Sequence, residues 1–183
     1  MRRLRATIVV VLALVVLAAA QRRRRDPLTP EESDQLREVA PEPEKKLKLY
    51  VTFAQARLVA IEQMRKDPKL AADRGQRLHD LLEDFTNIID EMDTNISDYA
   101  AQRLDLRKAL KVVIEGDTDF QLKLRTLKDA SSALEVAKEA KDYEFVLTDA
   151  TEAVDSDLDD SRAVLEKQNA AFEAAKEQAK KKK

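Results

Sequence analysis

The fold is decided by the stretch from Leu78 to Val113, LHDLLEDFTNIIDEMDTNISDYAAQRLDLRKALKVV. One set of residues recurs every seven positions, and a second set interleaves with it at three- and four-residue steps. The two sets are Leu78, Phe85, Met92, Tyr99, Leu106, Val113 and Leu82, Ile89, Ile96, Arg103, Leu110. All members except Arg103 are apolar or aromatic. Such a repeat predicts a coiled-coil seam, so we expect one helix over residues 77–115, about 60 Å long.

Helical patterns also flank this stretch. Apolar residues at three- and four-residue steps predict a helix over about residues 44–65, and Asp67-Pro68 then marks a break. Gly116 is expected to end the long helix in a tight turn. Residues 119–183 contain neither Gly nor Pro and carry two apolar stripes that differ in phase. We therefore expect a last helix with a kink between Ala140 and Asp160.

These lengths predict an all-α fold. We expect a long-helix antiparallel coiled coil, arranged as an elongated three-helix bundle with a projecting two-helix hairpin whose tip is Gly116. The seam of that hairpin would be half exposed, and exposed apolar surface marks a site of self-association or of protein binding. The predicted interaction seam consists of Ile96, Tyr99, Leu106, Leu110, Val113, Phe120, Leu124 and Leu127.

The composition excludes several classes of protein. With 2 Gly and 5 Pro in 183 residues, turns are too few for a β-rich fold. Absence of Cys excludes disulfides and thiolate metal sites. The formal net charge of -2 argues against a nucleic-acid partner. No P-loop, G-x-S-x-G or Glu-x-x-His motif is present, so we expect neither an enzyme nor a cofactor.

The first residues predict export. A basic start, Met1 to Arg5, precedes an apolar run over residues 6–20 that ends in three alanines. This pattern is typical of a signal peptide cleaved after Ala20, and the protein would then be periplasmic or otherwise extracytoplasmic. Arg22 to Arg25 follow at once and resist translocation. The alternative is therefore an inner-membrane anchor formed by residues 6–20, and membrane contact is expected only through residues 1–25.

A helix start follows the arginines. Thr29, Pro30 and Glu32 have the spacing of a capping box with proline in the first turn. Residues 28–32, LTPEE, resemble the Leu-Thr-x-x-Gln motif of the small helical periplasmic chaperones of the Spy and CpxP type, although Glu32 stands in place of Gln. The expected organisation is a signal or anchor (1–20), an Arg-rich linker with a short capped helix (21–43), a coiled-coil bundle (44–179) and a basic tail (180–183).

Two features were weighed as candidate metal or ligand sites. Acidic residues stand at positions 1, 3, 5 and 12 of a calcium-binding loop pattern, namely Asp155, Asp157, Asp159 and Glu166. Asp160 occupies the position where that loop needs glycine, so the alternative is an acidic helix face. His79, the only histidine, lies next to Leu78 and is expected on the solvent side of its helix.

Together these observations predict an exported, non-enzymatic helical protein of the cell envelope that acts as a structural or interaction scaffold. The alternative is a small periplasmic helical chaperone or a module that binds divalent cations weakly.

Overall fold

The computed structural model describes residues 26–133 and 137–181 and is all-helical, with no strand in those ranges. The predicted signal or anchor segment (1–20), Arg22 to Arg25 and the last two lysines lie outside the described residues. The helices are α2 (Pro30–Glu38), α3 (Pro43–Lys66), η1 (Pro68–Leu70), α4 (Arg74–Ala101), α5 (Arg107–Ser131), α6 (Ala137–Ala140) and α7 (Glu144–Lys181).

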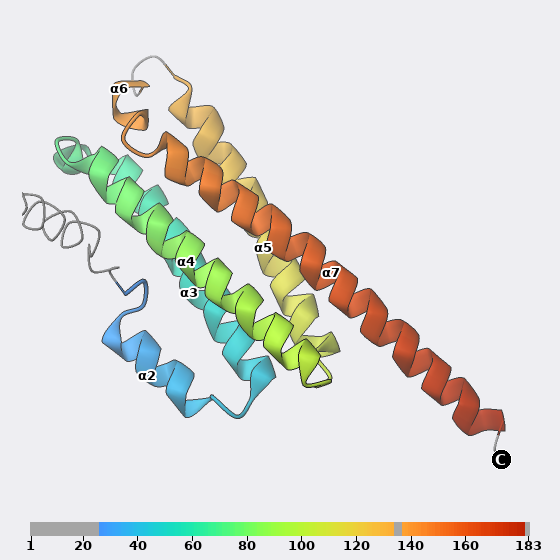
Figure 1. The fold of residues 1–183 in the computed structure, drawn as a ribbon. Helices are drawn as coiled ribbons and strands as arrows, with labels where there is room; N and C mark the ends of the chain where they lie inside the picture. The colour runs from blue at the N-terminus through green and yellow to red at the C-terminus, as the bar shows by residue number, and fades with distance from the viewer. Residues whose placement is uncertain (1–25, 134–136, 182–183) are drawn as a thin grey trace, which may run out of the picture.

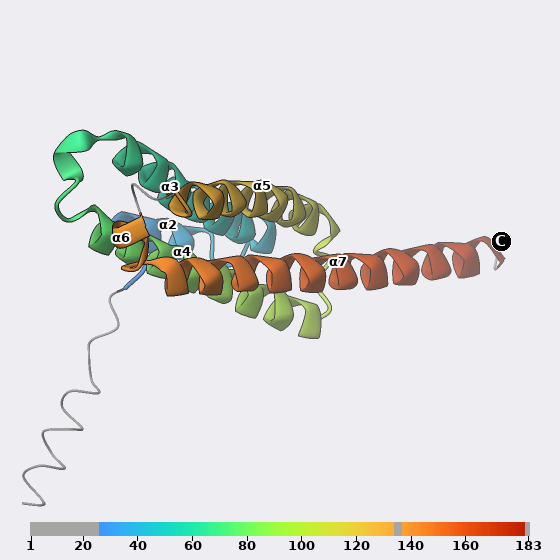
Figure 2. The ribbon, with the colours of Figure 1, turned by 90° about the horizontal axis from the view of Figure 1, so that it is seen from above.

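Four long helices form the body of the molecule. Helix α3 packs on α4 and α5, and α7 packs on α4 and α5. Figure 2 shows the resulting two layers, with α3 and α5 in one and α4 and α7 in the other. Helices within a layer run in the same direction, and helices stacked across the layers run in opposite directions (Figure 1). The two helices joined by the shortest connection, α4 and α5, thus lie on a diagonal of the bundle.

The predicted long helix over residues 77–115 is wrong, because the chain reverses at residues 102–106. Arg103 has φ 61°. Its N–H donates to the carbonyl oxygen of Ala100, and the N–H of Leu104 donates to that of Tyr99. This is the Schellman pattern that ends helices, with Arg103 where glycine is usual. The seven-residue repeat continues through the turn because Leu106 is buried at the start of α5.

Gly116 is not a turn, and the expected two-helix arm does not exist. Gly116 lies inside α5, where an added Cβ would stand 2.7 Å from Cγ1 of Val51 on α3. Glycine here permits a close approach of two helices. Because α3 and α7 both cover the hairpin made by α4 and α5, the predicted three-helix bundle with a projecting hairpin is replaced by four packed helices.

The core runs along the whole bundle. Its largest fully buried side chains include Tyr50, Phe85, Met92 and Phe120, and the rings of Phe85 and Phe120 meet edge to face with their centroids 5.4 Å apart.

The expected last helix over residues 119–183 is wrong, because residues 119–131 belong to α5 and the antiparallel α7 begins only at Glu144. The two apolar stripes differ in phase because they lie on two different helices, and α7 has no kink before Asp160. Helix α7 runs unbroken to Lys181.

The predicted capping box at the start of α2 is confirmed. The hydroxyl of Thr29 accepts from the N–H of Glu32, and Glu32 accepts from the N–H of Thr29. The same carboxylate accepts two hydrogen bonds from Arg57 of α3, one of them at 2.6 Å. Burial alone would raise the pKa of Glu32, but the bonds from Arg57 and Thr29 hold it below the usual value. This pair attaches α2 to the bundle.

Candidate functional site

The predicted calcium loop does not form, because its residues lie in the middle of the continuous helix α7. Asp155, Asp159 and Glu166 are exposed on this helix. Asp155 accepts a hydrogen bond of 2.6 Å from Gln121 of α5, and Asp159 lies 3.8 Å from Arg162. A loop can wrap its ligands around an ion, whereas a straight helix spreads them over different faces. Asp157 alone is buried, with 1% of its surface exposed.

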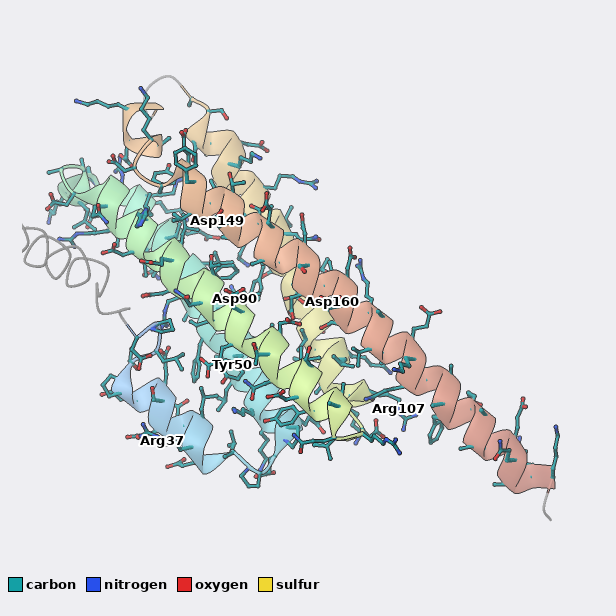
Figure 3. The ribbon with its side chains drawn as sticks, in the orientation of Figure 1. Arg37, Tyr50, Asp90, Arg107, Asp149 and Asp160 are labelled. Atoms are coloured by element: carbon teal, nitrogen blue, oxygen red, sulfur yellow. The ribbon has the colours of Figure 1, made fainter. Side chains whose placement is uncertain are left out.

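Asp157 belongs instead to a polar layer inside the core, which we call the carboxyl layer. It consists of Asp157 and Ser161 on α7 and Asp117 on α5, and both Asp117 and Ser161 are 0% exposed. Asp157 and Ser161 are four residues apart and share one face of α7. Figure 3 shows α7 crossing α5 at this level, next to the labelled Asp160.

The oxygens of the carboxyl layer lack partners. While both carboxyl groups are ionised, none of the four oxygens of Asp117 and Asp157, nor the hydroxyl of Ser161, has a hydrogen-bond partner among the described residues. A proton on one carboxyl group would link Asp117 to Asp157. Buried polar groups are almost always hydrogen-bonded, and leaving one unsatisfied costs on the order of 1–3 kcal/mol. A cluster of such groups therefore needs a physical explanation.

Further carboxyl groups lie close enough to the carboxyl layer to raise its pKa values. Burial raises the pKa of both Asp117 and Asp157 well above the usual value. The charge of Asp117 and a hydrogen bond between the two carboxyl groups raise the pKa of Asp157 further, whereas the same bond lowers that of Asp117. Asp93 on α4 and Asp160 on α7 raise the pKa of Asp157 further. The pKa of Asp93 is itself raised, by burial first and then by Asp160 and Asp90. The nearby Arg162 opposes the effect on Asp117, but its side chain is 54% exposed.

Sequence reasoning missed two members of this layer. Asp117 directly follows Gly116, where a turn was expected, yet it stands in register with the buried Val113, Phe120 and Leu124 of α5. Ser161 is in register with Val154 and Leu158 of α7 in the same way. A polar residue at an apolar position of a continuous helical stripe is the signal that could have identified both.

The predicted interaction seam lies elsewhere than expected. Seven of its eight residues are buried in the four-helix core, and Tyr99 is partly buried. The expectation of half exposure is therefore wrong, because α3 and α7 cover the faces that the predicted arm left open. His79 is half-buried rather than on the open solvent face, and its Nδ1 lies 3.1 Å from the carbonyl oxygen of Asp142.

The surface instead offers a groove at the end of the bundle. It lies between the α4–α5 turn and α7, and it is lined by apolar residues together with the cations Arg103, Arg107 and Lys167. Asp105 also lines it and pairs with Arg107 at 2.7 Å, which leaves Arg103 and Lys167 as the cations of the lining that form no ion pair among the described residues. Gln168 of α7 holds the turn in place, since its side chain accepts from the N–H of Leu106 and donates to the carbonyl oxygen of Leu104, both at 2.9 Å. The guanidinium of Arg107 covers the ring of Phe172 at 3.8 Å.

Comparison with known proteins identifies no relative: no family model, no curated protein and no solved structure matches the chain. Among the described residues, no helix is long and apolar enough to cross a membrane. Within the same ranges, no group of three or more His, Cys, Asp or Glu side chains is arranged to hold a metal ion.

Proposed function

We propose that this protein is a non-enzymatic helical scaffold that binds a partner protein at the end of the four-helix bundle. The observation that carries the proposal is the length of α7. From Asn169 to Lys181 every residue of this helix is exposed, and Figure 1 shows this part projecting beyond α4 and α5. It extends for about 20 Å.

Most helical stability in proteins comes from the packing of an apolar face, and this extension has no buried residue, so a bound partner would stabilise it. Phe172 is 47% exposed at the base of this extension. Beside it, the groove presents Ala100, Leu104 and Val164 between the cations Arg103 and Lys167. Apolar surface flanked by positive charge fits an amphipathic helix with acidic flanks. The partner is therefore an acidic amphipathic segment of another protein.

The burial of the most perturbed carboxyl groups supports the non-enzymatic assignment. Asp117 and Asp157, whose pKa values are the most raised among the carboxyl groups of the described residues, are closed off from solvent and do not line the groove. A substrate cannot reach them while the bundle is closed.

The test uses two synthetic helical peptides of equal length, one of Leu and Glu and one of Leu and Lys, labelled for fluorescence anisotropy. We expect the acidic peptide to bind and its affinity to fall as salt rises, because the attraction is screened. Phe172→Ala and Lys167→Glu should each weaken binding about tenfold or more. Leu122→Ser, on an exposed part of α5, is the control and should bind normally. Equal binding of both peptides, or of neither, would reject the proposal.

Export and placement in the cell envelope remain part of the proposal, supported by the basic start and the apolar run over residues 6–20. The test is the intact mass of the protein recovered from its host. A mass that corresponds to a chain starting at Gln21 supports cleavage and export. The mass of the full-length chain, found in the membrane fraction, supports the anchor.

A second candidate is a small periplasmic chaperone. It is favoured by two large apolar side chains outside the groove, Leu122 at 62% and Phe145 at 76% exposed. Such a chaperone would suppress the aggregation of an unfolding client protein, and Leu122→Ser with Phe145→Ser would remove that activity. Suppression that survives the double substitution, or none with the wild-type protein, would reject this candidate.

A further inference from the structure

The unexplained feature of this molecule is the carboxyl layer, whose two carboxyl groups and one hydroxyl are buried without partners. A shared proton is insufficient as an explanation. It can link one oxygen of Asp117 to one of Asp157, and it leaves the other two carboxyl oxygens and the hydroxyl unsatisfied.

Ser161 gives an independent indication of a ligand. Most hydroxyl side chains of α4, α5 and α7 donate back to the carbonyl oxygen four residues earlier, and the other two that do not, Ser97 and Ser156, are exposed to water. Thr118, next to Asp117, does so at 2.7 Å, and Thr151 on α7 at 2.8 Å. The carbonyl oxygen four residues earlier is the usual hydrogen-bond partner of a hydroxyl group inside a helix. Ser161 is 0% exposed and makes no such bond, so its oxygen is available to a group inside the core.

The charges around the carboxyl layer indicate what kind of ligand it would bind. The charges of Asp93 and Asp160 act on Asp157 in addition to that of Asp117, so three helices bring carboxylates to one region. Arg162, the cation whose charge acts on Asp117, lies toward solvent beside Asp159. A buried pair of carboxylates without a counter-charge is strongly unfavourable. A divalent cation between them would neutralise both and coordinate the unpartnered oxygens.

We propose that the carboxyl layer is a binding site for one divalent cation, coordinated by Asp117, Asp157 and Ser161. All three ligands supply oxygen, which selects hard cations over the softer transition metals. Ca²⁺ fits best, because it accepts two-oxygen binding by carboxylates and irregular coordination; the three side chains supply up to five oxygens, and enclosed water would complete the six to eight that Ca²⁺ takes. Mg²⁺ retains several water molecules in a strict octahedron, which a closed helical core accommodates poorly. The site is distinct from the predicted loop, of which only Asp157 takes part.

The experiment uses the full chain, treated with EDTA and dialysed, and then titrated with Ca²⁺ alone. At about one hundred times the dissociation constant we expect the melting temperature to rise by roughly 5–10 °C. Equilibrium dialysis should give one Ca²⁺ per chain. The rise with Mg²⁺ should be smaller. Binding should be slow, because the layer is closed and the helices must open locally to admit the ion.

Variants identify the ligands. Asp117→Asn and Asp157→Asn should each abolish the rise in melting temperature and the bound Ca²⁺. Both remove a buried charge without changing the side-chain shape, so both should fold, which circular dichroism verifies. Asp155→Asn and Asp159→Asn are matched controls on the exposed side of the same helix and should retain both effects. Ser161→Ala should weaken binding about tenfold.

The proposal is overturned if neither Ca²⁺, Mg²⁺ nor Mn²⁺ changes the melting temperature, which would leave shared protons and enclosed water as the occupants of the layer. It is also overturned if the shift persists in Asp157→Asn or disappears in Asp155→Asn and Asp159→Asn, since the ion would then bind the exposed acidic face. The peptide-binding test can be run in EDTA, so failure of the cation site and failure of the scaffold proposal are distinguishable.

Discussion

The aromatic layer of Phe85 and Phe120 and the neighbouring carboxyl layer are both buried in the core, but burial has opposite effects on their contributions to stability. Phe85 and Phe120 are fully buried and pack edge to face. Asp117 lies three residues before Phe120 on the same helix and is just as buried, yet its oxygens have no partner. Burial of the rings stabilises the bundle, whereas burial of the carboxyl groups opposes it. Equal burial thus marks a structural element in one layer and a candidate site in the other.

The largest expected effect comes from removing the aromatic layer. Phe120→Ala should lower the free energy of unfolding by about 3–5 kcal/mol, because it leaves a cavity where the ring contacted Phe85. Urea denaturation followed by circular dichroism measures the change. Leu122→Ala, two residues further along α5 and 62% exposed, should change the free energy by less than about 0.5 kcal/mol. Similar losses in both variants would contradict the assigned core.

A satisfied buried charge sharpens the contrast with the carboxyl layer. Arg57 donates to Glu32 and to the carbonyl oxygen of Pro27, each at 2.6 Å. Arg57→Ala leaves the carboxylate of Glu32 without this partner and should cost roughly 3 kcal/mol. Arg37→Ala, which breaks the exposed pair with Asp34, should cost almost nothing.

The same ion pair has a definite pH dependence. The pKa of Glu32 is lowered in the folded state, so its contribution is present above the unfolded value of 4.5 and is lost as pH falls through the lower folded value. Acid titration of wild type and Arg57→Ala should therefore bring their free energies of unfolding together at low pH. A difference that stays constant down to pH 2 would contradict the role of the pair.

Neutralising the carboxyl layer should raise the free energy of unfolding, whereas Phe120→Ala and Arg57→Ala lower it. In EDTA at neutral pH, Asp157→Asn should raise the free energy of unfolding by roughly 2 kcal/mol, because the wild-type carboxyl group must take up a proton to be buried whereas the amide keeps the shape without that cost. Asp155→Asn on the exposed face should leave it unchanged. Destabilisation by Asp157→Asn would mean that the carboxylate has a partner that stabilises it.

The smallest effect concerns the turn between α4 and α5. Arg103 occupies the left-handed region with φ 61°, which costs a non-glycine residue on the order of 1 kcal/mol. Arg103→Gly should therefore stabilise the protein by up to that amount. Lys108→Gly in α5, where helical geometry is required, should destabilise it by a similar amount. Thermal unfolding of the two variants measures both changes.

Sequence patterns predicted the elements better than their arrangement. The capping box at Thr29 and the helix limits near Pro43 and Lys66 follow from local chemistry and are confirmed. The reversal at Arg103 was missed because it contains neither Gly nor Pro, and because Leu106 continues the heptad into the next helix. Gly116 was assigned to a turn because a glycine that permits close helix packing has no local signature that distinguishes it from one that ends a helix.

The candidate site was predicted even less completely. Asp157 was identified, but as a member of a loop with Asp155 and Asp159, since sequence spacing does not distinguish a loop from one turn of an acidic helix. Asp117 and Ser161 become functional candidates only when α5 and α7 are packed together. Asp117 and Asp157 are forty residues apart and lie on different helices, so the site depends on how those helices pack. The periodicity within one helix does not predict which residues of two helices meet.

The central claim is that the protein's own groups do not satisfy the carboxyl layer, and the most direct test is the pH dependence of the free energy of unfolding in EDTA. The pKa values of Asp117 and Asp157 are raised in the folded state, with Asp93 and Asp160 acting in the same direction on Asp157 and Arg162 opposing the effect on Asp117. Their contribution is therefore complete below the unfolded value near 4 and is lost as pH rises through the folded values. We predict that wild type loses stability from pH 5 to pH 9 relative to Asp117→Asn/Asp157→Asn. Parallel profiles for the two proteins, or a wild type that gains on the double variant as pH rises, would contradict the account.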